Sequence, residues 1–212
     1  MVGHFFEPDE KICLVFSNEH YDKLRERPEF AKTWGDDGRD SLIRELGLND
    51  ELQYADIPRA REWADNFEEG IKAYGFSDDQ IKRYNDTDKD TMGSALMEVV
   101  AKIKQNASQG RRTLLLCFYA GHGATKEGIT WALFNSNLKF ELPLEYGLRY
   151  ILAREKGCYL ISFFACGRIK MPEEAKRGGA DTEVTAPRPI EDAGQGIYIY
   201  AASDGMPIMP DK

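Results

Sequence analysis

The stretch "TLLLCFYAGHG", residues 113–123, is an apolar run that ends in a histidine placed between two glycines. A short apolar run bounded by turn-forming residues is typical of a strand that is covered on both faces. The chain contains only three histidines. The position of His122, directly after the strongest strand signal in the sequence, therefore raises the question of what its imidazole does.

Other apolar runs of the same kind predict further strands. They alternate with segments of helical spacing, an arrangement that favours an α/β fold with a parallel or mostly parallel sheet covered on both faces. A weaker run, "QIKRYND", is interpreted as a short strand, and "ITWALF" after it as a hairpin or edge strand. The strong runs are "KICLVFSN" from Lys11, "CYLISFFACG" from Cys158 and "GIYIYAAS" from Gly196.

Three helices are expected between these strands. The first begins near Asp56, which can cap it, and its apolar residues recur at helical spacing as far as Tyr74. The second follows Asp90, a candidate N-cap, and the third is "LEYGLRYILAREKG", with Gly157 as its natural stop. The segment between His20 and Leu52 is charged and gives no clear pattern.

Length and composition narrow the class of protein. The chain has 212 residues, which suits a single domain over residues 1–212, and its formal net charge of -8 makes nucleic acid a poor candidate partner. Its apolar runs are shorter than the roughly 18 residues that a membrane helix needs. The start, "MVGHFFEPDEK", lacks a basic leader before an apolar stretch, so we expect a cytoplasmic protein without membrane contacts.

The cysteines fall into two groups. Cys13, Cys117 and Cys158 lie inside apolar runs, where thiols usually belong to the core. Cys166 lies where an apolar run gives way to glycine and a polar loop. Ligands of open α/β sheets bind beyond the carboxyl ends of the strands, so Cys166 and His122 emerge side by side if their two strands are neighbours.

A thiol and an imidazole at one rim suit nucleophilic catalysis. The imidazole can take the proton of the Cys166 thiol and then protonate a leaving amine. The glycines that flank His122 allow a substrate backbone to approach, and the amides of Gly123 and Cys166 are candidate oxyanion-hole donors. Spacing alone leaves the other reading open, in which Cys166 is one more core residue.

At these residues the chain resembles the caspase, metacaspase and paracaspase superfamily of cysteine peptidases. "LLLCFYAGHG" is similar to the histidine strand of that superfamily, and "YLISFFACGR" is similar to its nucleophile strand. The order of strands and helices fits as well. The resemblance implies a caspase-like three-layer α/β/α sandwich, a dyad of His122 and Cys166, an oxyanion hole at Gly123 and Cys166, and peptide or protein substrates.

The primary specificity pocket departs from the family pattern. Phe164 stands two residues before the nucleophile, where the family has a polar residue. Asp56, near the first helix, and Asp204 with Ala202, in the closing loop "AASDG", are candidate pocket residues. Acids there would suit Arg or Lys at P1 by charge pairing. Asp56 as a helix cap and Asp204 as a turn residue are the alternatives.

Residues 168–195 form a long loop at the place where caspases are cut during maturation. Lys176, Arg177 and Arg188 are candidate self-cleavage sites in it. The chain stops soon after "AASDG", before the last strand that the family pattern leads us to expect. That strand is either missing or supplied by a partner, and the edge near the C-terminus can pair with a second copy as a homodimer.

The segment "DTDKDTMG" invites a calcium interpretation, because many metacaspases require calcium. Counted from Asp86, the sixth and twelfth positions of an EF-hand loop are Thr91 and Met97 instead of Gly and Glu. We therefore predict no metal site and no cofactor, with calcium activation left as an alternative.

The leading hypothesis is a cysteine endopeptidase that cleaves after a basic residue. The alternative is a catalytically silent caspase-like module that regulates or binds other proteins. A nucleotide-binding protein is disfavoured, because no strand leads into a GxGxxG or phosphate-binding loop.

Overall fold

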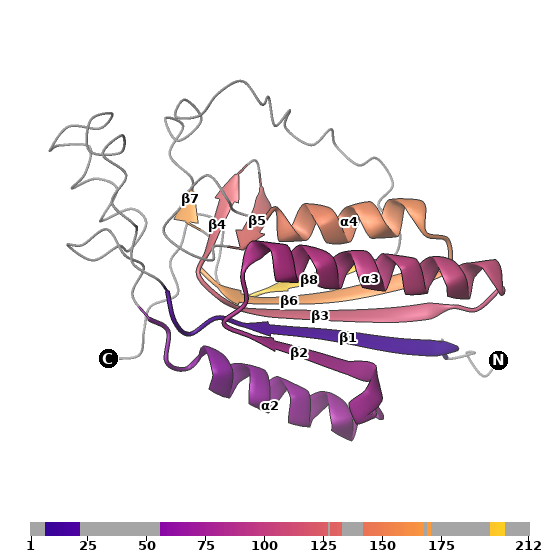
Figure 1. The fold of residues 1–212 in the computed structure, drawn as a ribbon, viewed down its shortest axis with the longest axis horizontal. Coiled ribbons are helices and arrows are strands. Elements are labelled where there is room, and N and C mark those ends of the chain that lie inside the picture. The colour runs from indigo at the N-terminus through magenta and orange to yellow at the C-terminus, as the bar shows by residue number, and fades with distance from the viewer. Residues whose placement is uncertain are drawn as a thin grey trace, which may run out of the picture.

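A computed structural model describes residues 7–21, 56–126, 128–132, 142–167, 169–170 and 196–201 (Figure 1). Its central feature is a five-stranded sheet with the strand order β2-β1-β3-β6-β8. Every neighbouring pair in this sheet is parallel. The strands are β1 (Glu10–Ser17), β2 (Ile81–Asn85), β3 (Thr113–Gly121), β6 (Cys158–Cys166) and β8 (Gly196–Tyr200).

Helices cover both faces of this sheet. Helix α2 (Ala60–Ala73) lies on one face, and α3 (Lys89–Ser108) and α4 (Leu144–Arg154) lie on the other (Figure 1). A short 3-10 helix, Asp78–Gln80, precedes β2. The expected three-layer α/β/α arrangement is confirmed. Within the described residues, no helix combines the length and apolar character needed to cross a bilayer.

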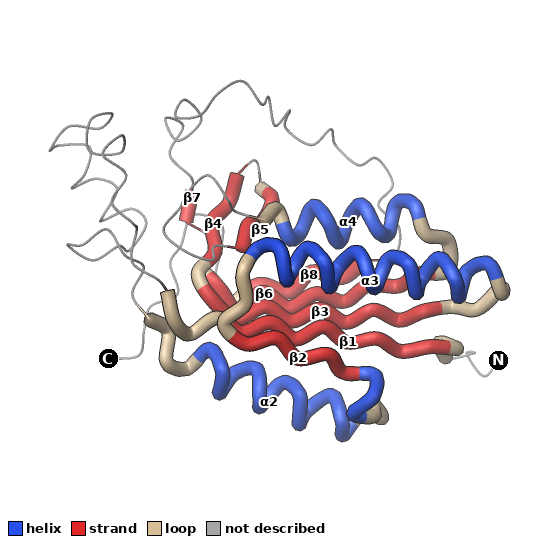
Figure 2. The backbone as a smooth tube through the Cα atoms, in the orientation of Figure 1, coloured by secondary structure: helices blue, strands red, loops and turns tan. Residues whose placement is uncertain are grey.

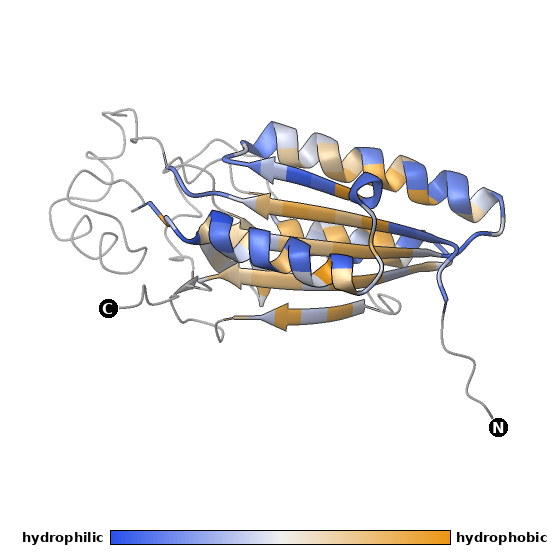
Figure 3. Cartoon of the chain, turned by 90° about the horizontal axis from the view of Figure 1, so that it is seen from below, coloured by the Kyte–Doolittle hydropathy of each residue, from blue (hydrophilic) through white to orange (hydrophobic). Residues whose placement is uncertain are grey.

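Two hydrophobic clusters make up the core, one on each face of the main sheet. Along β1, Leu14 and Phe16 belong to the cluster under α3 and α4, whereas Cys13 and Val15 belong to the cluster under α2. Figure 3 shows the second face, with the polar side of α2 turned outward over apolar strands. Burial on both faces explains why β1 and β3 have continuous apolar runs instead of an alternating pattern.

The helix starts differ from those predicted. The N-cap of α3 is Asp88, whose carboxylate accepts the Thr91 N–H at 2.7 Å, and not Asp90. Helix α2 begins at Ala60 without a side-chain cap, so the prediction that Asp56 caps it is wrong. A cap side chain reaches only the N–H groups two or three residues ahead. Asp56 is separated from the helix by the turn that contains Pro58.

A second, smaller sheet extends beyond the carboxyl ends of the main strands (Figure 2). It consists of β5 (Ile129–Ala132), β4 (Gly123–Lys126) and β7 (Ile169–Lys170), in that order. Strands β4 and β5 are antiparallel, which confirms the expected hairpin. Strand β4 replaces the turn expected after His122, and it pairs in parallel with β7. The chain that follows His122 is thereby held against the chain that follows Cys166.

Candidate active site

The two strands that end in the predicted dyad are direct neighbours. Strand β3 pairs with β6 in parallel along its whole length, and the last pair of the register joins Gly121 to Cys166. His122 is the next residue after Gly121. The expectation that these two strand ends lie side by side is therefore confirmed.

The glycines on both sides of His122 make room for atoms of the site itself. A Cβ at Gly123 would lie 2.6 Å from the Cys166 Sγ and 2.6 Å from the Gly167 carbonyl oxygen. A Cβ at Gly121 would lie 2.7 Å from the Tyr119 hydroxyl and 2.8 Å from that of Tyr21. These contacts leave no room for a side chain at either position. The expectation that the glycines admit a substrate backbone stays a prediction.

Two tyrosines hold the backbone of His122. Its N–H donates to the Tyr21 hydroxyl at 2.7 Å, and its carbonyl oxygen accepts the Tyr119 hydroxyl at 2.6 Å. The Tyr21 ring also meets the imidazole edge-on, with 4.6 Å between the ring centroids. Burial raises the pKa of Tyr21 above its ordinary value, which keeps the phenol neutral. Sequence reasoning missed Tyr21, because no pattern in the sequence links it to a residue 101 positions away.

The Cys166 side chain is buried. Its relative exposure is 0%, whereas His122 is half-buried. Residues of β6 alternate between the two faces, and Cys166 belongs to the cluster under α3 and α4. We expected both side chains to emerge at an open rim, and for Cys166 this is not observed. Its sulfur lies close to the backbone of Gly123 instead.

The other three cysteines are core residues, as predicted. Burial, and after it the Glu68 charge, raises the pKa of Cys13 to about 12. Burial, and after it the charge of Glu155, raises the pKa of Cys158 to about 12. Burial is also the main cause that raises the pKa of Cys117 above its ordinary value. These thiols are protonated at neutral pH and are poor nucleophiles.

The Asp56 carboxylate binds two neighbouring residues of the loop after β1. Its carboxylate contacts the Nδ1 of His20 at 3.1 Å and accepts the Tyr21 N–H at 3.1 Å. The His20 hydrogen bond, followed by that of Tyr21, lowers the pKa of Asp56, and the His122 charge contributes in the same direction. Asp56 is therefore an ionised, half-exposed acid within electrostatic range of the imidazole.

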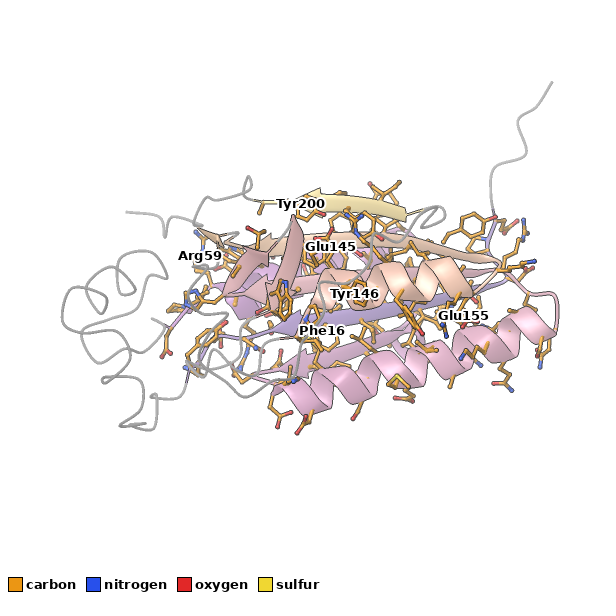
Figure 4. The ribbon with its side chains drawn as sticks, turned by 90° about the horizontal axis from the view of Figure 1, so that it is seen from above. Phe16, Arg59, Glu145, Tyr146, Glu155 and Tyr200 are labelled. Atoms are coloured by element: carbon orange, nitrogen blue, oxygen red, sulfur yellow. The ribbon has the colours of Figure 1, made fainter. Side chains whose placement is uncertain are left out.

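Phe164, the residue expected in the specificity pocket, lies in the core. Its exposure is 1%, and its ring stacks on that of Tyr200 with 5.4 Å between centroids. The Tyr200 hydroxyl donates to the buried carboxylate of Glu145 at 2.8 Å (Figure 4). Glu145 also accepts the Thr130 N–H and pairs with Arg149. This network ties β8 to α4 and β5 beside the nucleophile strand.

Several predicted residues fall outside the described ranges. These are the pocket candidates Ala202 and Asp204 and the candidate self-cleavage sites Lys176, Arg177 and Arg188. Of the long loop predicted over residues 168–195, only β7 is described.

One group of side chains within the described residues could hold a cation. Ligand atoms of Glu19, His20 and Asp86 lie within 4.8 Å of one another. Arg61 already pairs with Glu19 at 3.2 Å and with Asp86 at 3.1 Å. The Asp86 carboxylate also accepts backbone N–H groups of the other two residues. A cation would have to compete with the guanidinium, so this group by itself does not indicate a metal site.

Comparison with known proteins is consistent with this geometry. A family model described as the caspase domain matches residues 10–205. The match runs from the first residue of β1 past the end of β8 and contains both members of the predicted dyad. A search of curated proteins found no match.

Proposed function

Because this chain belongs to the caspase-domain family of cysteine peptidases, we propose that it hydrolyses peptide bonds with Cys166 as nucleophile and His122 as general acid and base. The observation that supports this most directly is the strand register. It pairs Gly121 with Cys166, and His122 is the residue that follows Gly121, which supports a role for both side chains in one site.

The reaction follows from the groups at the site. The Cys166 Sγ attacks the scissile carbonyl carbon while His122 takes the thiol proton. The carbonyl oxygen becomes an oxyanion, which the N–H groups of Gly123 and Cys166 stabilise. The C–N bond breaks as His122 gives its proton to the leaving amine, and a thioester remains. Water, deprotonated by His122, then attacks the thioester and releases the acid and the thiol.

The reaction requires a step that exposes the sulfur, because Cys166 is fully buried in this structure. The small sheet next to it offers a way to open. Among the residues that the structure describes, strands β4 and β7 are joined by two register pairs, Ala124 with Ile169 and Thr125 with Lys170. Separating so few pairs costs far less than disturbing the long β3–β6 ladder. We propose that the binding of a peptide moves this edge and exposes the thiol.

A basic residue at P1 is the preference that we propose. Asp56 is an ionised carboxylate near His122, and such a group attracts Arg or Lys. Asp204 is the second candidate acid. Lys176, Arg177 and Arg188 would be self-cleavage sites of the same specificity. Free buried cysteines in the chain suit a reducing compartment such as the cytoplasm.

A homodimer is proposed through the edge of the main sheet. Strand β8 is the last strand of the described sheet, and its Ile197 and Ile199 are 57% and 45% exposed. An exposed apolar edge strand is a template for pairing with another chain. Sedimentation of the purified protein tests this, and a monomer at micromolar concentration would contradict it.

A second candidate function is favoured by two observations. Both Cys166 and Phe164 are buried, which suits a caspase-like module that binds or regulates other proteins without cleaving them. The intact pair of cysteine and histidine favours the peptidase.

A peptide library that varies P1 among Arg, Lys and Asp separates the two functions. The wild type is expected to cleave after Arg or Lys, and Cys166→Ala and His122→Ala are expected to lose this activity to the same extent, because a dyad acts as one unit. Cys158→Ala is the matched control, since it removes another buried thiol from the same face of β6.

Each measurement is repeated with calcium and with a chelator, because calcium activation stays an alternative. Turnover in neither condition would favour the silent module, and turnover after Asp would contradict the acidic pocket.

A further inference from the structure

We infer that Tyr21 is a positioning residue for His122, fixing the imidazole in the orientation that proton transfer with Cys166 needs. This inference rests on the proposed function, because positioning matters only if His122 exchanges a proton with Cys166. It adds a residue on the loop after β1, far in sequence from both members of the dyad.

The contacts of Tyr21 reach both the backbone and the ring of His122. The hydroxyl accepts the His122 N–H at 2.7 Å, and the ring meets the imidazole edge-on at 4.6 Å and an angle of 65°. Tyr21 is 2% exposed and lies within electrostatic range of Cys166. The Tyr119 hydroxyl donates to the carbonyl oxygen of His122. Tyr21 therefore contacts the imidazole and the backbone to which it is attached.

Tyr21 is itself held by a loop whose backbone donors are all engaged. In residues 18–21, the first N–H donates to the Ala120 carbonyl at 2.9 Å. The N–H groups of Glu19 and His20 donate to the same carboxylate oxygen of Asp86 at 2.7 and 3.0 Å. The N–H of Tyr21 donates to the Asp56 carboxylate at 3.1 Å. Asp86 takes a positive φ of 46°, a conformation in which Asp is enriched. Because every backbone N–H of residues 18–21 is hydrogen-bonded, the loop holds the Tyr21 phenol in one position.

Proton transfer between a thiol and an imidazole depends steeply on their alignment, and a displacement of about 1 Å can cost on the order of 100-fold in rate. Loss of the Tyr21 hydroxyl leaves the His122 N–H without this acceptor, and the backbone that carries the imidazole gains freedom. Because the substrate does not contact the phenol in this account, the rate of chemistry should fall while substrate binding stays the same.

The test compares Tyr21→Phe with Tyr84→Phe. Tyr84 is a matched control because it also packs on another aromatic ring, Phe16 at 5.1 Å, but it lies on β2 away from the dyad. Three quantities are measured: kcat per titrated active site, KM, and the hydrogen exchange rate of the His122 amide by NMR. Tyr21→Phe is expected to lower kcat about 10-fold at unchanged KM and to speed His122 exchange about 10-fold. Tyr84→Phe is expected to change neither.

The outcomes separate this inference from the proposed function. If the wild type cleaves no peptide, the proposed function is wrong. If the exchange rate of the His122 amide is unchanged in Tyr21→Phe, the hydrogen bond between Tyr21 and His122 is contradicted, whether or not the wild type cleaves peptides. Faster exchange with an unchanged kcat per titrated site would show a purely structural role and overturn positioning. If Tyr21→Phe fails to fold, the wild type serves instead: nuclear Overhauser contacts between the Tyr21 ring and the His122 imidazole are required, and their absence overturns the proposal.

Discussion

Replacing Gly121 with alanine tests the packing of the site, because a methyl group there has no space. Its Cβ would lie 2.7 and 2.8 Å from the hydroxyls of Tyr119 and Tyr21, and 3.0 Å from a ring carbon of Tyr119. These two hydroxyls are the groups that bind the His122 N–H and carbonyl. The methyl group therefore has to displace both hydrogen bonds at once.

The expected cost can be worked out from these contacts. Two hydrogen bonds at about 1 kcal/mol each amount to about 2 kcal/mol. Overpacking destabilises the fold by about 1–3 kcal/mol more. Alanine also restricts the unfolded chain, which stabilises the folded state by up to about 1 kcal/mol. Gly121→Ala should thus lower the free energy of unfolding by about 2–5 kcal/mol. In a chain of this size that lowers the melting temperature by roughly 4–20 °C.

The assay is thermal unfolding followed by circular dichroism, with Gly70→Ala as the matched control. Gly70 lies inside α2, and beyond its chain neighbours and the helix's own backbone no atom lies within 4 Å of the Cβ that alanine would add. That variant should be stabilised by about 0.5–1 kcal/mol. A Gly121→Ala variant that melts within about 2 °C of the wild type would refute the placement of the two hydroxyls.

Four further substitutions test three other parts of the structure. Asp88→Ala should destabilise α3 by about 1 kcal/mol in urea unfolding, whereas Asp90→Ala should cost less than about 0.5 kcal/mol; equal effects would contradict the observed cap. The hydrogen bond to Asp56 raises the pKa of His20, so this pair contributes its full stabilisation below about pH 6.5 while Asp56 is ionised, and loses it as pH rises through the raised pKa of His20. Asp56→Asn should lower the pKa of His20 toward its ordinary value in an NMR titration, and an unchanged titration would show that the two groups do not interact. Glu145→Gln removes a fully buried negative charge, and with it the ion pair to Arg149, which is one-third exposed. The free energy of unfolding in urea should fall by about 2–3 kcal/mol, less than for a fully buried pair. A loss below about 1 kcal/mol would contradict the network.

The strands were the most predictable part of the fold. Burial on both faces leaves a continuous apolar run, and β1, β3 and β6 are such runs. The start of α3 was less predictable, because Asp88 and Asp90 stand two residues apart and either can cap a helix. Only the backbone conformation decides between them. The two-residue strand β7 has no pattern that sequence reasoning could detect.

The two strands that end next to His122 and at Cys166 could be predicted, because both are strong apolar runs. The contact of Tyr21 with His122 could not, since it joins residues 101 positions apart in the sequence. The burial of Cys166 was also missed. Its position at the end of a strand pointed to an exposed rim, but the small sheet formed by β4, β5 and β7 extends beyond that rim and brings Gly123 against the sulfur.

The most direct test of the proposed mechanism is the mass of the intact protein after reaction with a peptidyl electrophile that presents Arg at P1. The account predicts one adduct per chain on Cys166, no adduct in Cys166→Ala, and labelling slowed on the order of 100-fold or more in His122→Ala. It also requires that the three core thiols stay unmodified. An unlabelled wild type, or an adduct that persists in Cys166→Ala, would contradict the assignment of Cys166 as the nucleophile.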